Sequence, residues 1–226
     1  MAVLAFDTAT AATVVGLLEA GGALTEARHD PPPGGRPEHA QRLLPLVHQV
    51  VEDWDAVARI GVGLGPGSFT GLRIGIATAR ALAQGRGVPV VGVGTLAVVA
   101  RRLSDDFDGT CLAVLDARRG EVFAAMYRHH RTTMEPGVFP PAELAERVAA
   151  RREWGRSPML GVGDGAVRFR AELERSGVAV PSDGSPAHRV SALMICRLGR
   201  EREPVDRDSL LPDYRREPDA VPPSRE

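Results

Sequence analysis

The residues best suited to chemistry lie where two apolar runs end. Gly65–Gly71 reads Gly-Pro-Gly-Ser-Phe-Thr-Gly and leads into a stretch of small and aliphatic residues. Glycine tolerates positive φ and Pro66 fixes φ, so the chain can turn tightly and gather free backbone N–H groups at a helix N-terminus. Asp7-Thr8 ends the first apolar run and adds a carboxylate and a hydroxyl. The turn suits the binding of a phosphate, and Asp7 stands where an acidic residue would lie near a metal ion and that phosphate.

The turn matches none of the standard phosphate motifs. G-x-x-x-x-G-K-[ST] needs a lysine, which the sequence lacks, and G-x-G-x-x-G fails because Ser68 or Thr70 occupies the third glycine position. Ser68 is no nucleophile in G-x-S-x-G, since Pro66 replaces the first glycine. Two interpretations therefore stay open. The residues could form a phosphate-binding turn or the vestige of one, or they could form a packing turn in which Asp7 is bonded to nearby N–H groups. Both interpretations concern the same candidate residues: Asp7, Thr8, Gly65, Gly67, Ser68 and Gly71.

Other candidate sites are weaker. The turn Asp116-Ala117-Arg118-Arg119-Gly120 could hold a phosphate or a partner's carboxylate through its arginines, or be a solvated turn. The 6 histidines form neither H-x-x-x-H nor H-E-x-x-H, and neither cysteine has a ligand-spaced neighbour. We therefore expect no metal site and no catalytic residue.

Composition narrows the class of protein. The chain has 226 residues and a formal charge of −1, which gives no general attraction to polyanions. All 28 cationic side chains are arginine, so no lysine can act in catalysis. The apolar run Val88–Ala100 is shorter than the roughly 20 residues that cross a bilayer, and the lone Cys111 and Cys196 fit reduced thiols. We expect a cytoplasmic protein without membrane contact.

Hydrophobic periodicity predicts strands alternating with helices. Strands are expected at Ala2–Phe6, Thr13–Glu19, Ala23–His29, Arg59–Leu64, Val88–Val93, Thr110–Asp116, Glu121–Tyr127 and Met159–Gly163. Helices are expected at Glu38–Asp53, Gly71–Gln84, Thr95–Leu103, Glu143–Arg152, from Gly165 to about Arg175, and Val190–Arg200. Pro45 should bend the first helix or mark a restart of it.

This order predicts an α/β protein with a two-lobed actin-like (ribonuclease H-like, ASKHA) fold, in which helices cover mixed sheets. We expect residues 1–103 to form the first lobe and residues 104–226 a smaller second lobe, with an acidic break at Ser104–Gly109. Helix 190–200 would pack back on the first lobe, and residues 201–226 would form a charged, proline-rich tail.

The amino-acid sequence of several segments resembles that of the TsaB (YeaZ-like) family. GPGSFTGLRIG and PVVGVGTLAVVA carry the most specific likeness, and further matches run along nearly the whole chain: LAFDTAT, PEHAQRLLPLV, LAVLDARRGEVFAAMY, VGVGDGA and LLPDYRREPDA. The resemblance implies a non-catalytic partner subunit for threonylcarbamoyladenosine modification of tRNA. Such a subunit binds and activates the catalytic subunit TsaD, helps to recruit the ATPase TsaE, and meets tRNA only within the complex.

The resemblance also implies a homodimer when the chain is alone and no cofactor of its own, with ATP and threonylcarbamoyl-adenylate handled by partner subunits. TsaD carries an H-x-x-x-H metal motif, and those two histidine positions fall at Thr95 and Val99. Neither side chain ligates a metal as imidazole does. The resemblance therefore implies a protein with the two lobes of TsaD but without its metal site.

The two helices Glu38–Asp53 and Gly71–Gln84 have more apolar area than one core face requires. Gly71, Gly75 and Ala79 form a ridge of small residues that would permit close helix approach, or would pack only on its own sheet. We predict a partner interface drawn from Arg42, Leu43, Leu46, Val47, Val50, Ile74, Ala77, Thr78 and Ala81.

Two rival hypotheses remain. The chain could be an autonomous actin-like enzyme, either a small-molecule kinase or a glycoprotease-like hydrolase, although the missing lysine and metal ligands weigh against this. It could also be a homodimeric interaction module of another pathway, which copurifying partners would distinguish.

Overall fold

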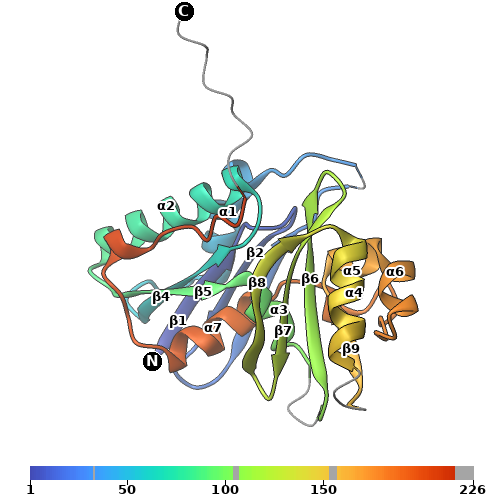
Figure 1. Ribbon diagram of the computed structural model, residues 1–226. Coiled ribbons are helices and arrows are strands. Elements are labelled where there is room, and N and C mark those ends of the chain that lie inside the picture. The colour runs from blue at the N-terminus through green and yellow to red at the C-terminus, as the bar shows by residue number, and fades with distance from the viewer. Residues whose placement is uncertain (33, 104–106, 153–156, 217–226) are drawn as a thin grey trace, which may run out of the picture.

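Two sheets organise the protein (Figure 1). The computed structural model describes residues 1–32, 34–103, 107–152 and 157–216. Residues 104–106 of the expected break between lobes and residues 217–226 of the expected tail lie outside this described part. One sheet has five strands and comes from the first half of the chain, and the other has four strands from the second half.

The first sheet is a meander extended by parallel strands, in the order β3-β2-β1-β4-β5. Its strands are β1 (Ala2–Asp7), β2 (Thr13–Leu18), β3 (Leu24–His29), β4 (Val57–Gly65) and β5 (Val90–Gly94). β1 to β3 pair antiparallel, whereas β4 runs parallel to both β1 and β5. β1 and β2 are buried along their whole length, which explains why both are nearly continuous apolar runs in the sequence.

Helices α1 (His39–Val50) and α2 (Phe69–Arg86) cover one face of this sheet. α1 ends at Val50 rather than at Asp53, and Pro45 lies in its middle rather than in its first turn. α2 begins at the N-cap Ser68, whose side chain accepts a hydrogen bond from Gly71 N, and ends at Gly87, which has φ of 66°. Both ends of α2 therefore carry ordinary capping signals.

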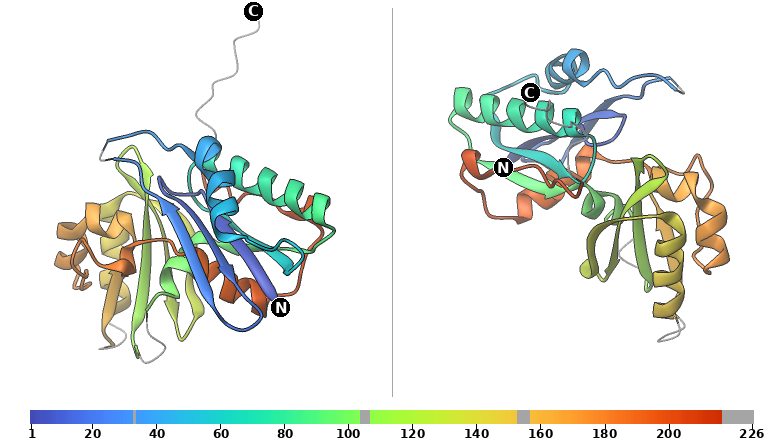
Figure 2. Two further views of the ribbon diagram at one scale, coloured as in Figure 1. Left: turned by 180° about the vertical axis from the view of Figure 1, so that it is seen from behind. Right: turned by 45° about the horizontal axis from the view of Figure 1, so that its top comes forward.

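A second core lies between the two sheets, where α3 (Thr95–Ala100) and α7 (Ala192–Glu201) pack. α7 covers the opposite face of the first sheet from α1 and α2 (Figure 2). Glu26 of β3 fixes its N-terminus, accepting hydrogen bonds from Ser191 Oγ at 2.7 Å and Leu193 N at 3.2 Å. A carboxylate at a helix N-terminus is also favoured by the helix dipole.

The second sheet repeats the meander, in the order β8-β7-β6-β9. Its strands are β6 (Thr110–Arg118), β7 (Glu121–Arg128), β8 (Arg131–Phe139) and β9 (Met159–Val162), and its outer face carries α4 (Pro141–Arg152), α5 (Asp164–Arg168) and α6 (Arg170–Arg175). The sequence analysis missed β8, a largely exposed edge strand whose Pro136 and Gly137 hide the strand pattern. It also predicted one helix where a break at Phe169 separates α5 from α6.

The chain after α7 returns along the first lobe. Val205 forms an isolated bridge with Val90, and a short 3₁₀ turn, η2 (Arg207–Ser209), follows. Leu210 is 1% exposed in the core beneath α2. Arg80 of α2 donates hydrogen bonds to the carbonyl of Leu210 at 2.7 Å and to that of Asp208 at 3.0 Å. Residues 205–210 are thus packed onto the first sheet and its helix.

None of the helices in the described part of the chain has the length and hydropathy needed to cross a membrane.

Substitution of Leu210 tests how much the C-terminal segment stabilises the first lobe. Leu210→Ala should lower the free energy of unfolding by about 2–4 kcal/mol, since it opens a cavity in a closed core. Its neighbour Leu211 is 67% exposed, so Leu211→Ala should change stability by no more than about 0.5 kcal/mol. Urea unfolding measures both values, and equal losses for the two variants would show that this segment is not docked as described.

Candidate functional site

The carboxylate of Asp7 is fully buried at the end of the central strand β1. One of its oxygens accepts a hydrogen bond from Ala9 N at 2.6 Å, and the other accepts one from the Thr95 hydroxyl at 2.8 Å. Thr95 Oγ1 in turn accepts from Gly65 N at 3.2 Å. Gly63 of β4 leaves room for the carboxylate, because a Cβ there would overlap it. We call Asp7, Thr95 and Gly65 the carboxylate lock.

The end of β1 is also joined to the N-terminus of α2. Thr8 donates its hydroxyl hydrogen to the carbonyl of Gly71 at 2.7 Å, and Ser68 N donates to the carbonyl of Ala9 at 2.7 Å. A Cβ at Gly71 would overlap the carbonyl oxygen of Thr8, so the helix can approach the strand this closely only with glycine there. The peptide between Gly65 and Pro66 is cis.

These contacts bring together five of the six residues of the predicted glycine turn site, and Gly67, where a Cβ would overlap the carbonyl oxygen of Ala9, lies beside them. They also occupy three of the N–H donors of the turn. The N–H groups of Gly65, Ser68 and Gly71 donate to Thr95 Oγ1, Ala9 O and Ser68 Oγ respectively. A phosphate needs such N–H groups to be free. Asp7 and these three N–H groups are therefore bonded as the packing interpretation expects.

Burial raises the pKa of Asp7 above its ordinary value of 3.8, although the hydrogen bonds from Ala9 and Thr95 act in the opposite direction. The carboxylate lock thus compensates only part of the loss of solvation. The sequence reasoning did not find Thr95 as the partner of Asp7, because the two residues lie 88 positions apart.

A cleft of about 500 Å³ separates the glycine turn from the β6–β7 turn of the second lobe. On its second-lobe side, Asp116 accepts hydrogen bonds from Arg168 Nη1 at 2.7 Å and from the backbone N–H of Arg118 at 2.9 Å. Asp164 Oδ1 accepts from the backbone N–H of Asp116 at 3.0 Å. The turn that could have held a phosphate through its arginines thus carries a carboxylate bonded within its own lobe.

At the mouth of this cleft, Phe69 stacks on Tyr214 with ring centroids 5.1 Å apart. The guanidinium of Arg73 lies 3.8 Å from the centre of the Phe69 ring, and its Nε donates to the Tyr214 hydroxyl at 2.9 Å. Arg216 then reaches the second lobe, where it donates to the carbonyl of Ala117 at 3.0 Å. The C-terminal segment therefore spans the cleft, which the sequence analysis did not anticipate from the LLPDYRR run.

The described residues contain no group of three or more His, Cys, Asp or Glu side chains that could hold a metal ion. The buried His39 contacts the Thr13 hydroxyl at 2.8 Å, and the buried His188 contacts the carbonyls of Gly163 and Pro181 at 3.2 and 3.1 Å. Thr95 and Val99 are both fully buried. Thr95 belongs to the carboxylate lock, and Val99 packs in the core between the sheets.

The predicted helix interface is only partly at the surface. Leu43, Val47 and Val50 are 2–4% exposed in the core beneath α1, so these three residues are not available to a partner. Arg42, Ala77 and Ala81 are exposed, and Leu46, Ile74 and Thr78 are half-buried. Gly71, Gly75 and Ala79 are buried against their own lobe. Leu44, which the prediction omitted, is 55% exposed.

We define the α1–α2 face as the surface formed by the six accessible residues of the predicted interface: Arg42, Leu46, Ile74, Ala77, Thr78 and Ala81.

Comparison with solved structures identifies the class of protein. The chain superposes on YeaZ from Pseudomonas aeruginosa with a TM-score of 0.76 and 30% identity, over 94% of this chain and 99% of that one. A ROK family protein from Streptococcus pneumoniae shares the fold alone, with a TM-score of 0.52 and 10% identity over 89% of this chain and 99% of that one. The protein is therefore an α/β protein of the two-lobed actin-like class, as the sequence analysis predicted.

Sequence comparison identifies the family. The chain is 32% identical over 185 residues to the tRNA threonylcarbamoyladenosine biosynthesis protein TsaB of Bacillus subtilis, covering 79% of this chain and 80% of that protein. Residues 28–150 match the family described as TsaD, tRNA N6-adenosine threonylcarbamoyltransferase. The chain belongs to the TsaB (YeaZ-like) family, which confirms the predicted resemblance.

Thr95→Val tests the carboxylate lock. The variant keeps the shape of the side chain but removes the hydroxyl that donates to Asp7 and accepts from Gly65, so we expect it to lower the free energy of unfolding by about 1–3 kcal/mol at neutral pH. Thr70→Val, at an exposed position of α2, is the matched control and should change stability by no more than about 0.5 kcal/mol.

The loss should also depend on pH. Because burial raises the pKa of Asp7, its titration contributes stability that is fully present below 3.8 and lost as the pH rises through the raised pKa of the folded state. Thr95→Val raises that pKa further, so the variant should lose more stability above it than in acid. Urea unfolding across a pH series measures this difference, and a pH-independent loss would contradict the role given to Thr95.

Proposed function

We propose that this protein is the non-catalytic partner subunit for N6-threonylcarbamoyladenosine modification of tRNA, and that it binds and activates the catalytic subunit TsaD. Its relative in Bacillus subtilis is named as a biosynthesis protein of this modification, and the matched family is named for the transferase itself. In this proposal the chain also helps to recruit the ATPase TsaE, meets tRNA only within the complex, and acts in the cytoplasm, where tRNA is modified.

The observation that carries the non-catalytic role is the carboxylate lock. Thr95 occupies the first of the two positions at which the resemblance to TsaD would put a metal-binding histidine, and its hydroxyl bonds Asp7 instead. The neighbouring turn N–H groups of Gly65, Ser68 and Gly71 are bonded within the chain. A site built this way stabilises the fold, so we propose that ATP and threonylcarbamoyl-adenylate are handled by the partner subunits.

The α1–α2 face is the surface we propose for TsaD. It combines the aliphatic side chain of Leu46 on α1 with Ile74 and the small residues Ala77 and Ala81 on the adjacent helix α2. Small residues allow another helix to approach closely, and aliphatic groups gain by leaving water. We propose that two copies of the chain pair through the same face when TsaD is absent, so that homodimer and heterodimer compete.

Charge placed on this face tests the proposal. Ala77→Glu and Leu46→Glu should each weaken binding to the cognate TsaD by at least about tenfold, because a carboxylate would be buried at the centre of a helix interface without a partner. Ala149→Glu adds the same charge at an exposed position of α4, on the outer side of the second lobe, and should leave binding unchanged.

Titration calorimetry with purified TsaD measures the three affinities, and sedimentation shows whether the homodimer weakens in parallel. Reconstitution of tRNA modification with TsaD and TsaE then tests the function. Wild-type protein that fails to bind TsaD at micromolar concentration would overturn the proposal, and tight binding by both α1–α2 variants would move the interface elsewhere.

A further inference from the structure

A second cavity, of about 260 Å³, lies at the opposite end of β6 from the cleft. The cleft is lined by Asp116 and Arg118, near the end of β6, whereas this cavity is lined by Cys111, near its start. Its walls come from α3, the β6–β7 pair, and the C-terminal end of α7 with Arg202 just beyond it, so both lobes contribute. Its apolar lining includes Ala97, Ala100, Leu103, Phe107 and Leu198.

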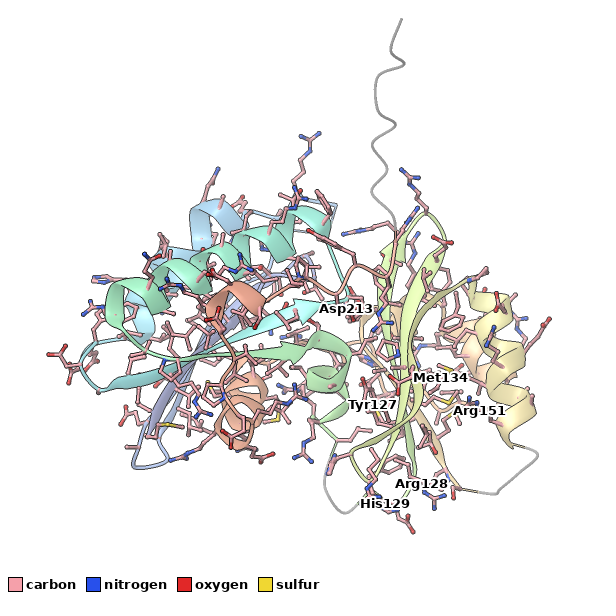
Figure 3. All side chains as sticks on the ribbon, turned by 60° about the vertical axis from the view of Figure 1, so that its left-hand side comes forward. Tyr127, Arg128, His129, Met134, Arg151 and Asp213 are labelled. Carbon is pink, nitrogen blue, oxygen red and sulfur yellow. The ribbon has the colours of Figure 1, made fainter. Side chains whose placement is uncertain are left out.

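The hydroxyl of Tyr127 has no hydrogen-bond partner among the described residues, although the side chain is only 8% exposed and lines this cavity. Figure 3 shows Tyr127 between the second sheet and the first lobe, with His129 farther along the hairpin. The hydroxyl oxygen itself is not sealed in the core, so a ligand in the cavity can reach it. Tyrosine hydroxyls that leave bulk water normally find a partner. Burial raises the pKa of Tyr127, so the group stays protonated and can donate a hydrogen bond into the cavity.

Among the described residues, the charged lining is mainly cationic. Arg101 and Arg202 line the cavity together with His129 and His130, and the one carboxylate in this described lining is that of Glu201. Arg101 Nη2 lies 3.5 Å from Glu201 Oε2, which is long for an ion pair, and the other guanidinium N–H groups of Arg101 can donate to a ligand. Arg202 Nη1 donates to the carbonyl of Gly92 at 3.1 Å. A bound anion would therefore meet two guanidinium groups as well as the Tyr127 hydroxyl.

Size limits the ligand further. An apolar cavity of about 150 Å³ can hold benzene. The present cavity, at about 260 Å³, has room for one six-membered ring and a short side chain. A bare inorganic anion would leave the apolar wall in contact with water, whereas a molecule with an apolar body would cover it.

We propose that this cavity binds a small organic carboxylate with a single apolar ring. The ring lies against the wall formed by α3 and Leu198, and the carboxylate accepts hydrogen bonds from the Tyr127 hydroxyl and from Arg101. This site is independent of the proposed function, since it shares no residue with the α1–α2 face. Because both lobes line the cavity, the ligand would fix them relative to each other.

The test uses 3-phenylpropionate as the probe and NMR of protein labelled with ¹³C in the tyrosine rings. The chain contains 2 tyrosines, so Tyr214, in the C-terminal segment, serves as the internal control. We expect a saturable shift of the Tyr127 signal with no shift of Tyr214. Loss of one hydrogen bond to a charged group should weaken binding about tenfold in Tyr127→Phe, measured by calorimetry, and Tyr214→Phe should bind as wild type does.

The neutral analogue 3-phenylpropanol tests the charge. It should bind more weakly than the acid to wild type, and Arg101→Gln should remove most of that difference. This rim substitution also keeps the proposal testable if Tyr127→Phe fails to fold. The proposal is overturned by the absence of a saturable Tyr127 shift at millimolar probe, by equal shifts of both tyrosines, by unchanged affinity in a folded Tyr127→Phe, or by equal affinity for the alcohol.

Discussion

The structure depends on a carboxylate buried at the end of its central strand. Asp7 is fully buried, so its carboxyl oxygens must find their hydrogen-bond partners within the chain. Its two donors are the backbone N–H of Ala9, just after β1, and the hydroxyl of Thr95, in the first turn of α3. That hydroxyl in turn accepts a hydrogen bond from Gly65 N at the end of β4. Satisfying one acid therefore fixes the strand, the glycine turn and the interlobe helix relative to each other.

The same bonding pattern is what the proposed scaffold role rests on. In the glycine turn, the N–H groups of Gly65, Ser68 and Gly71 are bonded within the chain, and across the cleft Asp116 is bonded to Arg168. These polar groups beside the cleft thus help to hold each lobe together. The two surfaces we propose for recognition lie outside the cleft, on the α1–α2 face and in the cavity beside Tyr127.

Much of the fold could be predicted because its signals are local. Apolar runs mark β1 and β2, and the glycine turn marks the start of α2. The missed strand β8 is an exposed edge strand, where burial imposes no apolar pattern and Pro136 is tolerated. The helix faces were assigned less well: three of the predicted interface residues, Leu43, Val47 and Val50, point into the core, whereas Leu44 points outward.

The sequence by itself determined the family, the two-lobed class, and the set of residues around the glycine turn. Local hydrophobic patterns and short sequence motifs are enough to recognise all three. Only the tertiary structure decided that Thr95 is the partner of Asp7, that Leu210 lies beneath α2, and that the Tyr127 hydroxyl faces a cavity. Each of these contacts joins elements far apart in the chain. Their geometry follows from how the sheets and helices pack, which no local pattern encodes.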